Sequence, residues 1–142
     1  MKNASWTVWV APVVALLCAA AVCGAVLLWA PVCAGSLELA NGNMVPMRCT
    51  YTAKVALLLA LMLAIVAVAA LGTKRPMTAA LVLLSAAIVL MTFDTPLSIG
   101  VCKGADMACQ VTAVWLRVAG GLSAAAALAG ALFSPDRKSV VE

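Results

Sequence analysis

Sulfur-bearing side chains occur in two matching clusters along the chain. Both clusters carry the pattern Met-x-Cys-x-x-Thr-Ala, at residues 47–53 and again at 107–113. A further cysteine precedes each copy, Cys33 in the first case and Cys102 in the second. Thiols in such clusters can form disulfides, exchange disulfides with other molecules or bind a soft metal ion. The repetition itself predicts two related halves.

Disulfide formation is the first chemistry that the cysteines suggest. Cys33 and Cys49 belong to the first half, and Cys102 and Cys109 to the second, so each half could close its own bridge. Paired cysteines beside loops are typical of an oxidising compartment, where each disulfide contributes about 2 to 4 kcal/mol of stability. Four cysteines allow three pairings, and the repeat favours pairing within each half.

Metal binding and redox catalysis are the alternatives. Thioether and thiolate sulfur atoms are the ligands that Cu(I) prefers, which makes candidate ligands of Met47, Met107, Cys49 and Cys109. A disulfide-exchanging enzyme commonly uses Cys-x-x-Cys, and this pattern is absent here. The chain also has no histidine, which excludes His-ligated haem. No cofactor is therefore expected, with copper and quinone left open.

Composition identifies the surroundings that must hold these side chains. Of the 142 residues 66% are hydrophobic and only 10% are charged, whereas soluble domains average about 25% charged residues. The basic residues are scattered rather than arranged in a stripe, so a nucleic-acid partner is excluded. We therefore expect an all-α polytopic membrane protein in contact with a lipid bilayer.

Four apolar stretches are long enough to cross about 30 Å of hydrocarbon. The predicted transmembrane helices form two repeated helical hairpins in a single membrane domain, residues 1–142, and lie at about 7–33, 51–71, 77–98 and 110–133. The connecting segments are extracytoplasmic loops at 34–50 and 99–109, a cytoplasmic turn at 72–76 and a cytoplasmic tail at 134–142. Loop cysteines on one face and Lys74 and Arg75 on the other favour this orientation, with both termini in the cytoplasm.

Charged and small residues inside the predicted spans indicate how the helices contact one another. Charges in hydrocarbon are costly and usually paired, so Asp94 is expected to pair with Arg117 or Lys54, as a structural pair or along a polar pathway. Gly120-x-x-x-Ala124 predicts close packing of the fourth helix. Thr52 and Thr112, which begin the even-numbered helices, are expected to hydrogen-bond locally as caps or back to a carbonyl.

The motifs also resemble those of a known family. Residues 47–53, followed by Ile99-Gly100-Val101-Cys102 and by 107–112, are similar to those of small bacterial four-helix membrane proteins catalogued as a domain of unknown function. The likeness runs from about Trp9 to Phe133, and Tyr51 stands where many relatives carry Trp. The resemblance implies a location in the bacterial inner (plasma) membrane and an even set of cysteines, without an established activity.

The predicted function is that of a non-enzymatic accessory subunit in a membrane complex of the transport type, with a disulfide-stapled extracytoplasmic cap. The chain lacks the nucleotide-binding Gly-x-x-x-x-Gly-Lys pattern, so any active transport would need energy from a partner. That partner would be another membrane protein or further copies of the chain. A membrane thiol–disulfide oxidoreductase and a Cu(I)-handling protein remain alternatives, which leaves open whether the chain is an enzyme.

Overall fold

Long apolar runs fold into helices because backbone polar groups have no water to bind in a bilayer and must pair within the segment. The computed structural model describes residues 3–33, 35–73, 77–96, 98, 100–104 and 106–133. Its helices are α1 (Asn3–Gly24), which continues as the π-helix η1 (Ala25–Trp29), α2 (Arg48–Thr73), α3 (Thr78–Leu90) and α4 (Ala108–Phe133). The prediction of an all-α fold with four helices is confirmed.

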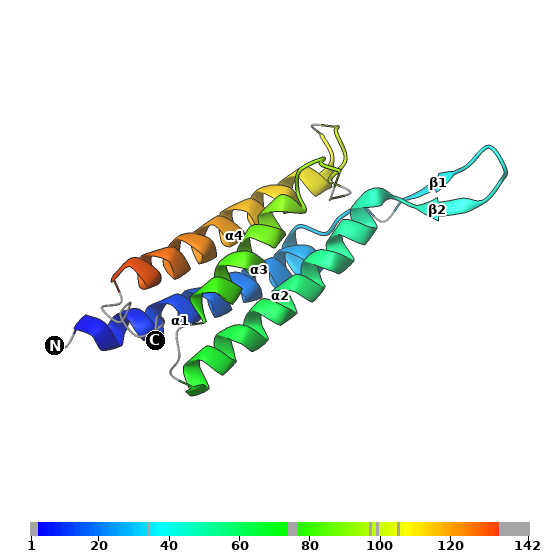
Figure 1. Ribbon diagram of the computed structural model, residues 1–142. Helices are drawn as coiled ribbons and strands as arrows, with labels where there is room; N and C mark the ends of the chain where they lie inside the picture. The colour runs from blue at the N-terminus through cyan, green and yellow to red at the C-terminus, as the bar shows by residue number, and fades with distance from the viewer. Residues whose placement is uncertain are drawn as a thin grey trace.

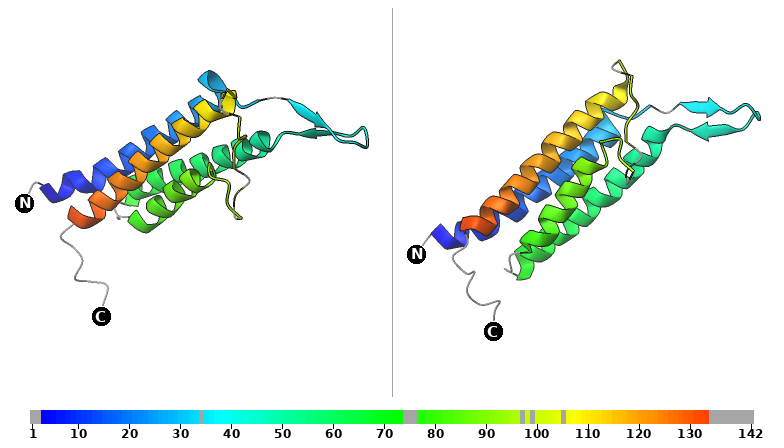
Figure 2. Two further views of the ribbon diagram at one scale, coloured as in Figure 1. Left: turned by 90° about the horizontal axis from the view of Figure 1, so that it is seen from above. Right: turned by 45° about the horizontal axis from the view of Figure 1, so that its top comes forward.

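The four helices form an up-and-down bundle (Figure 1). α1 packs against α2 and α4, and α3 packs against α4 and α2, so the helices follow one another around a ring (Figure 2). α1 begins and α4 ends at one end of the bundle. At the opposite end, which we call the hairpin end, the chain passes from α1 to α2 and from α3 to α4.

Small side chains fill the bundle interior and large ones face outward. The core is rich in alanine, including Ala15, Ala19, Ala56, Ala60, Ala67, Ala119 and Ala127. Large apolar side chains such as Leu28 and Leu83 are exposed, which is the arrangement expected where lipid covers the outer surface. Among the described residues, three segments are long and apolar enough to cross a membrane: Trp9–Trp29, Arg48–Thr73 and Ala108–Phe133.

The third helix is shorter than predicted. It ends at Leu90 rather than near residue 98, and its 13 residues span about 20 Å. The N–H groups of Thr92 and Phe93 bond to carbonyls three residues back, which tightens and closes the last turn. The described residues between Leu90 and Ala108 then cross the hairpin end of the bundle before α4 begins.

A short β-hairpin occupies the region predicted as the first loop. β1 (Ser36–Glu38) pairs antiparallel with β2 (Met44–Pro46), and the two strands project beyond the helices (Figures 1 and 2). The turn contains Asn41-Gly42, with Gly42 at φ 76°, a conformation that favours glycine and is typical of tight hairpin turns. Residues 74–76 and 134–142, which carry most of the predicted cytoplasmic turn and the tail, lie outside the described residues.

Candidate functional site

The four loop cysteines gather at the hairpin end of the bundle. Cys49 and Cys109 lie in the first turns of α2 and α4 and are 0% exposed. Cys33 and Cys102 lie in the segments that lead into these helices and are half-buried. We call these residues the four-cysteine cluster. The other two cysteines, Cys18 and Cys23, belong to α1.

Contacts within the four-cysteine cluster cross between the two halves of the chain. The side chains of Cys102 and Cys33 both lie near those of Cys49 and Cys109. The Cys49 Sγ atom is 3.8 Å from the carbonyl oxygen of Cys33. All four side chains are free thiols in this structure, so the disulfides expected from the sequence stay a prediction.

Two buried threonines form hydrogen bonds between the two halves of the chain. The hydroxyl of Thr52, on α2, donates a hydrogen bond to the carbonyl oxygen of Gly100 at 2.8 Å. The hydroxyl of Thr112, on α4, donates to the carbonyl oxygen of Ala30 at 2.5 Å. Their contacts with carbonyls of their own helices are longer, 3.4 and 3.5 Å. The sequence suggested only local bonds, whereas the shorter bonds join the first half to the second.

Two glycines that the sequence analysis did not single out complete the cluster. The N–H groups of Met47 and Met107 bond to the carbonyls of Gly35 and Gly104, each at 3.3 Å. A Cβ atom added at Gly35 would lie 2.7 Å from Met47 Cε, and one at Gly104 would lie 3.2 Å from Met107 Cε. Each glycine stands two residues after a loop cysteine, and this shared Cys-x-Gly pattern was the signal that could have revealed them.

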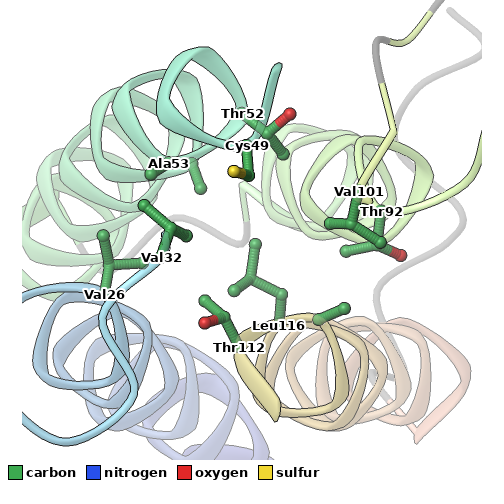
Figure 3. A pocket seen from close by; sticks show the side chains of 11 residues that line it. Val26, Val32, Cys49, Thr52, Ala53, Thr92, Val101, Thr112 and Leu116 are labelled. Carbon is green, nitrogen blue, oxygen red and sulfur yellow. The ribbon is translucent and has the colours of Figure 1, made fainter. Parts of the chain in front are cut away.

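A small cavity lies beside Cys49 (Figure 3). Matching positions of the two halves contribute to its wall, namely Val32 with Val101, Thr52 with Thr112, Ala53 with Ala113 and Ala56 with Leu116. The centre of a water molecule has about 10 Å³ of space in it, roughly the room that one water needs. The cavity is therefore too small for an organic substrate.

The cysteines among the predicted copper ligands do not form a metal site with other acidic or thiol side chains of the described residues. Among the described residues, no group of three or more His, Cys, Asp or Glu side chains is placed to hold a metal ion. The thioethers of Met47 and Met107 pack over Gly35 and Gly104. Their role as copper ligands stays a prediction.

The intramembrane charges do not pair as predicted. Asp94 forms an ion pair with Lys103, at 3.1 Å between Nζ and Oδ2 and largely in solvent, because α3 ends early and carries Asp94 out of the bundle. Arg117 instead reaches the end of α3. Its Nε donates to Thr92 Oγ1 at 2.9 Å, its Nη2 bonds to the Thr92 carbonyl at 3.3 Å, and its guanidinium lies 4.5 Å from the centre of the Phe93 ring.

Lys54 also lacks the predicted acidic partner. Its Nζ lies 5.9 Å from the centre of the Tyr51 ring, one turn back on α2. At this distance the ammonium group makes a cation–π contact with the ring face. The prediction that Asp94 pairs with Arg117 or Lys54 was therefore wrong.

Comparison with known proteins places the chain in a family but assigns it no activity. Neither the curated proteins nor the solved structures contain a significant match. A family model described as a domain of unknown function, DUF4418, matches residues 15–134, which include the second half of α1, the other three helices and the four-cysteine cluster. The chain belongs to the DUF4418 family.

Proposed function

We propose that the protein is a non-enzymatic accessory subunit of a membrane complex and that it contacts another integral membrane protein through its β-hairpin. The observation that carries this proposal is a hairpin with an exposed apolar face on a bundle whose interior is filled.

The bundle interior favours a structural role over transport by this chain alone. Alanine and leucine side chains fill the space between the helices, and the cavity beside Cys49 holds about one water molecule. Arg117 is a charged residue inside a candidate span, and its guanidinium contacts the Thr92 carbonyl and the Phe93 ring. A substrate path would therefore require a partner to supply most of its wall.

The β-hairpin has the properties of a contact element. Leu37 pairs with Val45 in the strand register, and alternation places Leu39 on the same face. All three are exposed, by 56%, 38% and 47% in that order. An isolated two-stranded hairpin is only marginally stable in water, and exposed apolar clusters commonly mark binding surfaces. A partner that covers this face would stabilise the hairpin.

We place the hairpin end on the extracytoplasmic side of a bacterial inner membrane, with both termini in the cytoplasm. The cysteines at that end suit an oxidising compartment, and Lys74 and Arg75 suit the opposite face. Similar contacts in both halves, such as Met47 with Gly35 and Met107 with Gly104, support an origin by duplication. On the extracytoplasmic side, Cys33–Cys49 and Cys102–Cys109 disulfides would staple the segments at the hairpin end, which form the extracytoplasmic cap.

The test is site-specific photocrosslinking in the native membrane. A photoreactive residue replacing Leu37 should crosslink to one second membrane protein, whereas the same residue replacing Glu38 faces the other side of the strand and should crosslink much less. Leu37→Asp should dissociate the complex on native gels, and Glu38→Gln should leave it intact. A chain that migrates alone from native membranes, or that crosslinks only to further copies of itself, would refute this partner assignment.

A further inference from the structure

Aromatic residues lie near the two ends of the bundle and not in its middle. The chain has four tryptophans, one tyrosine and two phenylalanines, all at positions that the structure describes. Those at the hairpin end, which we call the hairpin-end belt, are Trp29, Tyr51, Phe93 and Trp115. Those at the opposite end are Trp6, Trp9 and Phe133. All four side chains of the hairpin-end belt are exposed, so they face whatever surrounds the bundle.

Contacts place the hairpin-end belt at one level of the bundle. The Trp29 and Trp115 rings meet edge to face, with their centroids 5.6 Å apart. The Phe93 ring contacts the guanidinium of Arg117, which stands about 3 Å along α4 from Trp115. Matching positions of α2 and α4 line the cavity together, so Lys54, which directly follows one of them, lies at nearly the same level.

Charged side chains also end at this level. Lys54 and Arg117 are the last charged residues of α2 and α4, and both helices are uncharged from there to their ends. The ion pair of Asp94 with Lys103, directly after Phe93, is largely in solvent. Because an exposed ion pair is costly in hydrocarbon, lipid tails must stop short of it.

The end of α3 indicates the same level by a separate argument. Thr92, in the turn that closes α3, accepts a hydrogen bond from Arg117, so this helix ends at the hairpin-end belt. The described residues between that turn and Ala108 are not helical. Lipid tails would leave the polar groups of such a backbone without partners, whereas water outside the hydrocarbon can bind them.

Helix lengths agree with this boundary. α2 and α4 have 26 residues each and are about 39 Å long, which exceeds the roughly 30 Å of hydrocarbon in a bilayer. The aromatic groups are closer to that thickness, because Trp115 and Phe133 are about 27 Å apart along α4 and the segment Trp9–Trp29 spans about 30 Å. The excess length therefore lies at the hairpin end.

We infer that the hairpin-end belt binds the headgroup region of a lipid bilayer and that the hydrocarbon ends there, rather than at the starts of α2 and α4. Tryptophan and tyrosine favour this interface, and lysine and arginine extend their charges from it toward water. Cys109 stands about 9 Å beyond Trp115. The four-cysteine cluster and the β-hairpin therefore lie on the water side of the boundary.

The first experiment measures depth along one exposed face of α4. Val111, Val118 and Leu122 share this face and are 54%, 51% and 58% exposed, so they differ in depth rather than in packing. In the full-length chain in lipid nanodiscs, each is replaced in turn by a ketone-bearing amino acid coupled to a nitroxide, which leaves the cysteines unmodified. The nitroxide at Val111 should collide more often with a water-soluble nickel chelate than with oxygen. This order should reverse at Leu122, with Val118 between them.

Two results of this experiment would overturn the inference. If oxygen collisions also dominate at Val111, the hydrocarbon reaches the start of α4. If nickel collisions dominate at all three positions, no bilayer covers this face.

The second experiment uses the unsubstituted chain, because all four tryptophans lie in the two aromatic groups. Their fluorescence should be quenched more strongly by lipids brominated near the headgroup than by lipids brominated near the ends of the acyl chains. The opposite order would place the tryptophans inside the hydrocarbon and contradict the inference. Neither experiment needs a partner protein or depends on which end faces the cytoplasm, so both are independent of the proposed subunit role.

Discussion

Gly120 shows at the scale of a single residue how closely α3 and α4 approach. A Cβ atom added at Gly120 would lie 2.7 Å from Val89 Cγ2 and 3.0 Å from the Ser85 carbonyl oxygen. The carbonyl belongs to the α3 backbone and cannot rotate away, so Gly120→Ala should force the helices apart. We expect a loss of about 1 to 3 kcal/mol in the free energy of unfolding, measured by denaturant titration in detergent.

The neighbouring glycine provides the matched control. A Cβ atom added at Gly121 would meet nothing within 4 Å, so Gly121→Ala should gain helix propensity of up to about 1 kcal/mol without a clash. Equal stabilities for the two variants would show that α3 and α4 are not in this contact. The sequence predicted small residues on the fourth helix, but only the helix packing distinguishes Gly120 from Gly121.

The hydrogen bonds of Thr52 and Thr112 connect α2 and α4 to segments in the other half of the chain. Thr→Val keeps the shape of either side chain but removes the hydroxyl, which leaves the buried carbonyl of Gly100 or Ala30 without this donor. Each substitution should cost about 1 to 3 kcal/mol of stability. Thermal unfolding in detergent measures this loss, and faster alkylation of Cys49 should accompany it because the covering segments loosen.

Thr73 supplies the control for these two positions. Its hydroxyl bonds to the Ala69 carbonyl of its own helix, in an exposed position. Thr73→Val should therefore change stability by no more than about 0.5 kcal/mol. If Thr73→Val were as damaging as Thr52→Val, the cross-half bond could not explain the loss.

The end of α3 depends on Arg117. A lysine at this position would keep the positive charge but could not make the two guanidinium bonds to Thr92 or stack on Phe93. Arg117→Lys should lower the free energy of unfolding by about 1 to 3 kcal/mol. Lys103→Ala breaks the exposed ion pair with Asp94 and should cost no more than about 1 kcal/mol. The reverse ranking, measured by the same unfolding titration, would contradict this account.

Helices and charge partners differ in how far sequence alone predicts them. The four helices follow from their long apolar runs, because that signal is local. The early end of α3 and the partners of Asp94 and Arg117 depend on how α3 and α4 pack in the assembled bundle, which no local pattern specifies. The β-hairpin did leave a local signal, Asn41-Gly42. The cysteines were found from their repetition, but the contact of Cys102 with both halves required the assembled bundle.

The whole molecule imposes a two-sided arrangement that can be tested directly. Because the chain runs up and down through four helices, the β-hairpin and the start of α4 share one end, and the start of α1 and the end of α4 share the other (Figure 1). If the bundle spans the membrane as proposed, a peptide epitope inserted between Asn41 and Gly42 lies outside the cell membrane. The same epitope attached at either terminus lies inside.

Antibody labelling of intact spheroplasts should therefore detect the epitope in the β-hairpin turn and miss both terminal epitopes until the membrane is permeabilised. The turn is a suitable insertion point because a Cβ atom at Gly42 would meet nothing within 4 Å, so the bundle need not adjust to added residues. Labelling of a terminal epitope on intact spheroplasts would invert the orientation and place the four-cysteine cluster in the reducing cytoplasm. There its thiols would stay reduced, and the proposed Cys33–Cys49 and Cys102–Cys109 disulfides would not form.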